Sequence, residues 1–285
     1  MYRLIPSPLR YPGGKSRAVP LILRLVPEYR EYREPMVGGG SVFLALRQLN
    51  PKAGYWINDL NEDLFSVWVS IRDDAFSMMR MVHGIRERYK NPRDLFLYLR
   101  DWQVSSTLER AVRYFILNRI GFSGLVDTGG TFSEYAYYKL FSASVIRRIG
   151  QLSPLLEGVR ITNEDYSVLL HEPGEGIFVF LDPPYVTAGG YLYGKDGKLH
   201  EQFNHHRFAM ECRRCRHRWL ITYDDCDMVR NLFVGYDQVS WRLQYGMNNA
   251  GGNRARPGDE LFVANYPISH LVPHQLSLDL WGTLP

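Results

Sequence analysis

The segment from residue 33 to residue 59 constrains the fold most, because its pattern reads strand, glycine-rich turn, helix, strand. The run REPMV leads into Gly38-Gly39-Gly40, and SVFLALRQL and YWIND follow. Two parallel strands need a crossover between them, and a helix after a glycine-rich turn is the crossover of nucleotide-binding βαβ units. The chain is therefore expected to contain a parallel sheet with helices packed on it.

Strand patterns return from about residue 159 onward. The runs VRIT, GIFVFLD, WLITYD, QVSWRL and ELFVANY are apolar, as in strands buried on both faces, and Phe203–Arg214 suits a helix between two of them. We expect these strands to join the βαβ unit in one sheet. The predicted fold class is α/β, a Rossmann-like sheet with helices on both faces.

The middle of the chain has a different pattern. Apolar residues recur at three- and four-residue steps through 61–120, which predicts helices, whereas 121–141 is rich in Gly, Ser and Tyr and predicts a loop or hairpin. A chain of 285 residues is long enough for two domains. We predict an α/β domain formed by residues 1–62 and 156–285, interrupted by a mostly helical domain at 63–155.

Composition narrows the class of protein. Hydrophobic residues make up 45% of the chain and charged residues 22%, which is typical of globular proteins rather than disordered or membrane chains. No apolar run approaches the roughly 20 residues of a membrane helix, and the first residues, with three prolines, do not resemble a signal peptide. With an odd count of three cysteines, the chain is expected to be cytoplasmic. Its net charge of +4 permits a nucleic-acid partner without requiring one.

The tetrapeptide Asp182-Pro183-Pro184-Tyr185 directly follows the apolar run IFVFL. Ligands of open α/β sheets bind beyond the carboxyl ends of strands, so chemistry is expected here. Two prolines make a stiff loop that holds the Asp182 carboxylate and the Pro183 carbonyl side by side as acceptors. Such a pair matches an exocyclic amino group, and Tyr185 offers a face on which a base can stack. The alternative is a rigid turn without a ligand.

The glycine-rich turn is a second candidate site. Gly38 and Gly40 let a ligand approach the backbone closely, but Phe43 replaces the third glycine of the dinucleotide fingerprint. Asp59 follows Gly40 by 19 residues, near the offset at which an acid binds ribose hydroxyls. The alternative for Asp59 is a helix-capping role after a tight turn.

A third candidate is the run RYPGGKS, which ends near Lys15. A phosphate-binding P-loop would need a glycine where Leu9 stands. A Gly-Gly turn followed by a cation suits a carboxylate better than a triphosphate.

In their order along the chain, RYPGGKS, EPMVGGGSVF, NDLN, NRIGFSG, DPPY and NNAGGNRARPGDELFVANY resemble the Dam-like (D12 class, alpha-group) DNA adenine-N6 methyltransferases. The resemblance extends over nearly the whole chain. It implies an S-adenosylmethionine-dependent catalytic domain at 1–62 and 156–285 and a target-recognition domain at 63–155. The implied reaction transfers the methyl group of S-adenosyl-L-methionine to the N6 amine of an adenine flipped out of a specific double-stranded DNA sequence.

The resemblance also implies roles for particular residues. Asp182, Pro183, Pro184 and Tyr185 would form the catalytic pocket for the target base. Within the cofactor site, Gly38 and Gly40 would border the methionine end, Asp59 would hold the ribose, and Asp165-Tyr166 would receive the adenine. The full set of implied cofactor residues is Tyr11, Lys15, Pro35, Gly38, Gly40, Asp59, Asp165, Tyr166 and Asp182.

DNA contacts are expected in the NRIGFSG segment, through Asn118, Arg119, Phe122 and Ser123. Members of the family that read GATC carry an Arg where this chain has Asp127, so the resemblance predicts a different sequence beside the target. Asp127 either accepts a hydrogen bond from cytosine N4 or caps the turn that follows it.

A second glycine-rich stretch carries Arg254 and Arg256, which are expected to contact phosphates.

Alternatives stay open at the level of sequence. An N4-cytosine or RNA adenine methyltransferase is one, although N4-cytosine enzymes usually carry Ser where Asp182 stands. A nucleotide-binding dehydrogenase-like protein is another, and it leaves the DPPY motif unexplained. Cys212 and Cys215 lack a second paired set of ligands, so no metal is predicted. The expected partners are double-stranded DNA and a cognate restriction endonuclease, with the chain a monomer or weak dimer.

Overall fold

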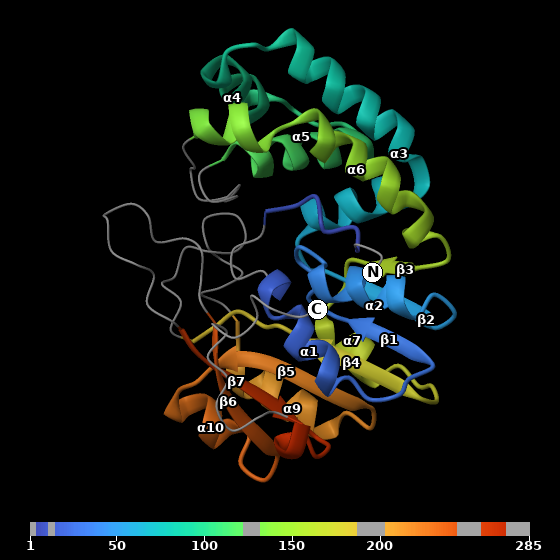
Figure 1. Cartoon of the computed structure of the whole chain (residues 1–285), viewed down its shortest axis with the longest axis vertical. Coiled ribbons are helices and arrows are strands. Elements are labelled where there is room, and N and C mark those ends of the chain that lie inside the picture. Colours follow the sequence, from blue (N-terminus) through green and yellow to red (C-terminus); the bar gives the residue numbers. More distant parts are fainter. Residues whose placement is uncertain (1–3, 11–14, 122–131, 187–202, 244–257, 272–285) are drawn as a thin grey trace, which may run out of the picture.

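The computed structural model describes residues 4–10, 15–121, 132–186, 203–243 and 258–271. Seven strands form one sheet in the order β3-β2-β1-β4-β5-β7-β6 (Figure 1). The strands are β1 (Glu31–Glu34), β2 (Gly54–Asn58), β3 (Arg160–Thr162), β4 (Ile177–Leu181), β5 (Arg218–Asp224), β6 (Asp237–Leu243) and β7 (Gly258–Ala264).

The sheet is parallel from β3 to β5, and β7 then runs antiparallel to both β5 and β6. The chain moves outward from β1 to β3 and returns to β4 on the other side of β1. The gap beyond the ends of β1 and β4 is the position at which such sheets bind ligands. Because β7 is antiparallel, its first residues lie beside the carboxyl end of β5.

Helices cover both faces of the sheet, which confirms the predicted fold class. On one face, α1 (Val19–Leu25) and α2 (Ser41–Leu49) pack over side chains such as Tyr32 and Phe178. On the other face, α7 (Tyr166–His171), α9 (His205–Arg214) and α10 (Asp227–Leu232) pack over Val179 and Ile221. All five side chains of β4 are buried, since it lies between two parallel strands with both faces covered.

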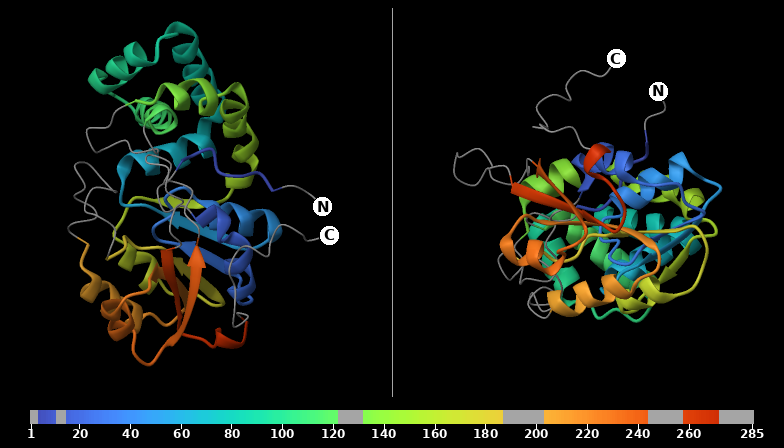
Figure 2. Two further views of the ribbon diagram at one scale, coloured as in Figure 1. Left: turned by 60° about the vertical axis from the view of Figure 1, so that its left-hand side comes forward. Right: turned by 90° about the horizontal axis from the view of Figure 1, so that it is seen from below.

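A group of helices lies beyond the β3 side of the sheet, at the end of the molecule opposite β6 and β7 (Figures 1 and 2). They are α3 (Glu62–Arg88), α4 (Pro92–Asp101), α5 (Thr107–Ile120), the short π-helix η3 (Ala136–Leu140) and α6 (Ala143–Leu156). Among the described residues, no helix is long and apolar enough to span a membrane.

Helix α3 has two parts. Asn61 caps its start by accepting hydrogen bonds from the N–H groups of Asp63 and Leu64. The helix is interrupted at Asp74, whose φ of −152° and ψ of 60° are not helical. Before this kink, Trp68 packs edge-on against Phe43 of α2, with ring centroids 6.1 Å apart. The first part of α3 therefore contacts the α/β region.

Two local predictions need correction. The predicted strand REPMV ends early, because Pro35 has no N–H to continue the ladder and β1 stops at Glu34. The segment 121–141 is not loop throughout, since η3 occupies its last part and packs against α5. Gly121 pairs with Phe132 in an antiparallel bridge, and the residues between them lie outside the described ranges.

Candidate active site

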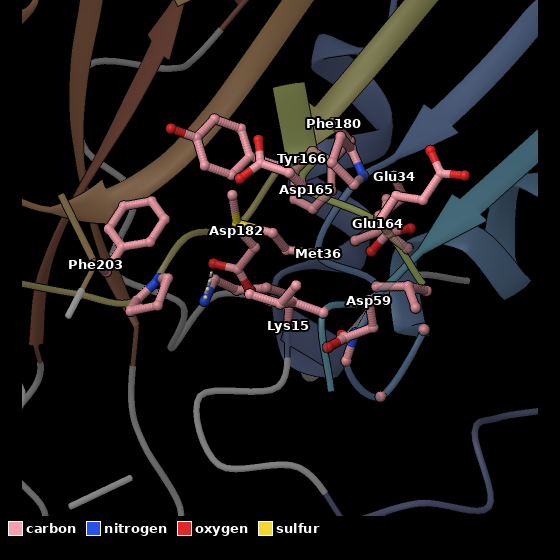
Figure 3. A pocket seen from close by; sticks show the side chains of 18 of the residues that line it. Lys15, Glu34, Met36, Asp59, Glu164, Asp165, Tyr166, Phe180, Asp182 and Phe203 are labelled. Atoms are coloured by element: carbon pink, nitrogen blue, oxygen red, sulfur yellow. Dashed lines mark hydrogen bonds and ion pairs between the residues drawn. The ribbon is translucent and has the colours of Figure 1, made fainter. Parts of the chain in front are cut away.

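A cavity of about 290 Å³ opens at the carboxyl ends of β1, β2 and β4. In Figure 3 the Asp182 and Lys15 side chains meet near its centre, with Phe203 on one side and Asp59 on the other. Eight of the nine predicted cofactor residues line it, and the ninth, Tyr11, lies outside the described residues. The eight are Lys15, Pro35, Gly38, Gly40, Asp59, Asp165, Tyr166 and Asp182.

The glycine turn (Gly38–Gly40) forms one wall of the cavity. Gly38 and Gly40 have φ of 46° and 65°, a region that side chains disfavour. A Cβ at Gly40 would lie 2.6 Å from the Trp68 ring, and the Trp68 indole N–H donates to the Gly38 carbonyl at 3.2 Å. Glycine is therefore required at position 40 both for its backbone conformation and for space.

Asp59 ties the glycine turn to the end of β2. Its carboxylate accepts the N–H of Gly38 at 2.8 Å and that of Asn61 at 2.9 Å. Burial raises the pKa of Asp59 to about 6, against the lowering effect of these two bonds. Since Asn61 caps α3, the capping alternative for Asp59 is wrong.

Asp165 caps α7 and also contacts α9. It accepts the N–H of Ser167, and both of its oxygens accept from the Arg207 guanidinium at 2.9 Å. Although burial acts in the opposite direction, the bonds from Arg207 and Ser167 lower the pKa of Asp165. The Arg207 guanidinium also lies 5.2 Å from the centre of the Tyr166 ring. The ion pair between Asp165 at the start of α7 and Arg207 of α9 thus forms one wall of the cavity.

The DPPY loop (Asp182–Tyr185) begins at the carboxyl end of β4. Asp182 Oδ1 lies 2.8 Å from the buried Lys15 ammonium and accepts a hydrogen bond from Thr222 Oγ1 at 2.8 Å. Both of these contacts use Oδ1. Such a carboxylate is held in one orientation by a cation and a hydroxyl from different parts of the chain.

Sequence analysis did not identify two buried carboxyl groups of this region. Glu34 lines the cavity and accepts from the Tyr32 hydroxyl at 2.6 Å. Burial raises the pKa of Glu34 well above its usual range. Glu260 of β7 accepts from the Tyr185 hydroxyl at 2.5 Å. Glu34 lies in the EPMVGGGSVF motif and Glu260 in the segment NNAGGNRARPGDELFVANY, but neither residue was assigned a role there.

The predicted DNA contacts Asn118 and Arg119 have buried side chains in the structure. Asn118 exchanges two hydrogen bonds with the backbone of Arg10. Arg119 donates to the carbonyls of Pro8 and Leu140, and burial lowers its pKa to about 10. These bonds hold the N-terminal segment and η3 to α5.

The remaining predicted DNA contacts are Phe122, Ser123, Asp127, Arg254 and Arg256, and all five lie outside the described residues.

The cysteines form no site in this part of the chain. Cys212 and Cys215 are buried free thiols, and burial raises the pKa of both. The Cys215 thiol donates to the Leu170 carbonyl at 3.2 Å. Within the described ranges, no group of three or more His, Cys, Asp or Glu side chains is arranged to hold a metal ion.

Comparison with known proteins identifies the family. The family model of the D12 class N6 adenine-specific DNA methyltransferase matches residues 11–247. A DNA adenine methylase of Vibrio cholerae serotype O1 is 30% identical over 274 residues, which cover 91% of this chain and 95% of that protein.

Two further relatives have similar identities. A DNA N-6-adenine-methyltransferase of Escherichia phage P1 is 29% identical over 246 residues, or 80% of this chain, and the match spans 31% of the phage protein's length. The Type II methyltransferase M1.LlaDCHI of Lactococcus lactis subsp. cremoris is 29% identical over 208 residues, 67% of this chain and 71% of that protein. The chain belongs to the D12 class of N6 adenine-specific DNA methyltransferases, whose methyl donor is S-adenosyl-L-methionine.

Proposed function

We propose that the DPPY loop receives an adenine flipped out of double-stranded DNA and orients its N6 amine for methylation. The observation that carries this proposal is the fixed Asp182 carboxylate, which lies in the cavity wall between Lys15 and Thr222. An acceptor held in place before the substrate arrives loses little in ordering when the amine binds.

The residues of the cavity fit the methyl donor by their charge. Among the described residues, five acidic side chains line it, against the two cations Lys15 and Arg207. An excess of carboxylates suits a ligand that carries a sulfonium and an ammonium group. We assign the methionine end to the glycine turn, the ribose to Asp59, and the adenine to the region of Asp165 and Tyr166. The acidic residues are Glu34, Asp59, Glu164, Asp165 and Asp182.

The chemistry required of the chain is positioning. S-adenosyl-L-methionine supplies an already activated methyl group, so no covalent intermediate with the chain is needed. In this proposal, the Asp182 carboxylate and the Pro183 carbonyl each accept one N6–H of the adenine. This draws the amine out of conjugation with the ring and directs its lone pair toward the methyl carbon. Pro184 keeps the loop stiff, and Tyr185 supports the base.

Base extrusion gives a direct test. A duplex with 2-aminopurine at the target position should become more fluorescent when the protein binds, since the base leaves the stack. Tyr185→Ala should bind the same duplex with a smaller rise in fluorescence and should lose methyl transfer. A wild-type protein that methylates its site without any rise in fluorescence would contradict the flipping step.

We propose that residues 1–62 and 156–285 form the catalytic domain and residues 63–155 the target-recognition domain. In support, the helices from α3 to α6, which follow β2 and precede β3 in the sequence, pack on one another. Helices α3 and α6 connect this group to the two adjacent strands of the sheet.

We assign recognition of the DNA sequence to Phe122, Ser123 and Asp127, and contact with DNA phosphates to Arg254 and Arg256. An Asp near DNA is unfavourable beside phosphates, so we propose that Asp127 accepts a hydrogen bond from a cytosine N4 group. The methylated sequence should then differ from GATC on the 5′ side of the target adenine. Asp127→Arg should shift preference toward guanine there.

Methylation mapping of DNA from cells that express each variant decides this. GATC methylation by the wild type, unaltered by Asp127→Arg, would leave Asp127 as a turn residue.

We further propose that the chain acts as a monomer or weak dimer beside a cognate restriction endonuclease. The similarity to a protein named as a Type II methyltransferase supports the second point. Sedimentation at micromolar concentration tests the first. Cleavage of unmethylated, but not methylated, site DNA by a neighbouring gene product tests the second.

A further inference from the structure

The DPPY loop is attached to the antiparallel edge of the sheet by two buried carboxyl groups. The Tyr185 hydroxyl donates to Glu260 at 2.5 Å, and the next residue, Val186, donates its N–H to Asp224 at 3.2 Å. Glu260 is 1% exposed and Asp224 is 6% exposed. The two residues lie opposite each other, at the end of β5 and near the start of β7.

This placement depends on the direction of β7. In a parallel strand, the first residues would lie at the far edge of the sheet from the active site. Because β7 is antiparallel to β5, its third residue lies beside the carboxyl end of β5 and within reach of the loop that follows β4.

We propose that Glu260 is a positioning residue for methyl transfer, which acts by fixing Tyr185 and with it the loop that carries Asp182. This role rests on the proposed function of the DPPY loop. A hydrogen bond between a hydroxyl and a carboxylate is short and strong, and it restricts rotation of the phenol ring. Lys15 also contacts this ring, since its ammonium group lies over the ring face at 4.7 Å from the centre.

A purely structural role would not require a carboxylate at position 260. Burying a carboxyl group is costly, and the following residues of β7, Leu261 to Ala264, are apolar and buried. A hydrophobic side chain would fill the same volume at lower cost. Glu260 instead accepts the hydroxyl of Tyr185, which we assign to the base pocket.

The charges around Glu260 make its state depend on pH. Burial raises the pKa of Glu260 to about 7, Lys15 and Tyr185 lower it, and Asp182 and Asp224 raise it. The residue opposite Glu260 on β6 is Trp241, which carries no charge. Above pH 7 the carboxylate accepts the Tyr185 hydroxyl as a charge-assisted bond, and below pH 7 the bond is weaker.

A double-mutant cycle tests the proposal. Tyr185→Phe removes the donor of the bond, and Glu260→Gln replaces its charged acceptor by a neutral amide oxygen, while both keep the shape of the side chain. Each should slow single-turnover methyl transfer by roughly 10-fold. The double variant should be no slower than Tyr185→Phe, because the charge of the acceptor no longer matters once the donor is gone. Affinity for S-adenosyl-L-methionine should stay within about 2-fold of wild type, since the bond lies outside the cofactor contacts.

Asp259→Asn is the matched control, since it changes the preceding residue of the same strand. The Asp259 side chain is 65% exposed and contacts Arg242. This variant should keep wild-type turnover. The rate of wild type relative to Glu260→Gln should rise from pH 6 to pH 8, because Gln does not titrate.

Two results overturn the proposal. One is a double variant whose loss is the product of the single losses. The other is a folded Glu260→Gln protein with wild-type rates at every pH, measured beside an inactive Tyr185→Ala. Full activity of Tyr185→Ala would instead contradict the base pocket itself. Tyr185→Phe tests the same bond even where Glu260→Gln lowers stability.

Discussion

The glycine turn and the DPPY loop face the same cavity but are held in different ways. The glycine turn is held through its own backbone groups: the N–H of Gly38 donates to the Asp59 carboxylate, and the N–H of Gly40 donates to the Val37 carbonyl. Side chains from distant parts of the sequence hold the DPPY loop, namely Lys15, Thr222 and Glu260. The turn therefore depends on which backbone conformations its residues can adopt, whereas the loop depends on charges.

Removal of the fixed acceptor should give the largest effect. Asp182→Ala leaves the amine without its preorganised partner and should lower methyl transfer at least roughly 100-fold. Thermal unfolding should show a folded protein, and S-adenosyl-L-methionine should still bind. The measurement is single-turnover transfer of labelled methyl groups to site DNA. Near-normal turnover would show that the loop does not act through Asp182.

A backbone change should break the other region. Gly40→Ala places a Cβ against Trp68 and strains a residue with φ of 65°. Gly158→Ala is the control, because Gly158 also has positive φ, of 72°, but no atom lies within 4 Å of its added Cβ.

Both changes should cost about 1–2 kcal/mol of unfolding free energy for the left-handed conformation. Gly40→Ala should lose roughly a further 1–3 kcal/mol and should also weaken S-adenosyl-L-methionine binding. Urea unfolding and calorimetry measure the two quantities. Equal losses in both variants would contradict the contact with Trp68.

Asp59 should give an effect that is spread over several pH units. Its pKa is about 6 in the folded chain and lower in the unfolded chain, so folding favours the protonated form. Its contribution to the free energy of unfolding is fully present near pH 4 and is lost as the pH rises through 6. Stability of wild type relative to Asp59→Asn should therefore fall by up to about 3 kcal/mol from pH 4 to pH 7.

Asp101→Asn is the control for that series. Arg100 lowers the pKa of the exposed Asp101, so its replacement should show no such fall. If the stability of wild type relative to Asp59→Asn instead rose with pH, this would contradict the raised pKa of Asp59.

The sequence predicted the parts of the site that local patterns encode. The glycine turn, Asp59 after β2 and Asp182 after β4 each lie beside a strand or turn that can be recognised in the sequence. Backbone geometry then brings these positions together, since the carboxyl ends of neighbouring parallel strands meet at one edge. This is why Gly38, Asp59, Asp165 and Asp182 all reach one cavity.

The parts that could not be predicted depend on contacts between distant segments. Polar residues such as Asn118 and Arg119 look like ligand contacts in a sequence, because their buried backbone partners in the N-terminal segment are not visible there. Glu260 lies inside an apolar run whose antiparallel direction decides where its side chain lies. Neither a burial partner nor a strand direction follows from spacing alone.

The kink at Asp74 gives α3 a mechanical consequence. The first part of the helix carries Trp68, which donates to the Gly38 carbonyl, and its start pairs with Arg110 of α5. After the kink, Met79 accepts the N–H of Gly150 of α6. If residues 63–155 bind DNA as proposed, a rotation of α6 that is absorbed at Asp74 would leave the glycine turn in place, whereas one transmitted through the kink would move it through Trp68. The stiffness of the kink would then contribute to the thermodynamic coupling between DNA binding and methyl-donor binding.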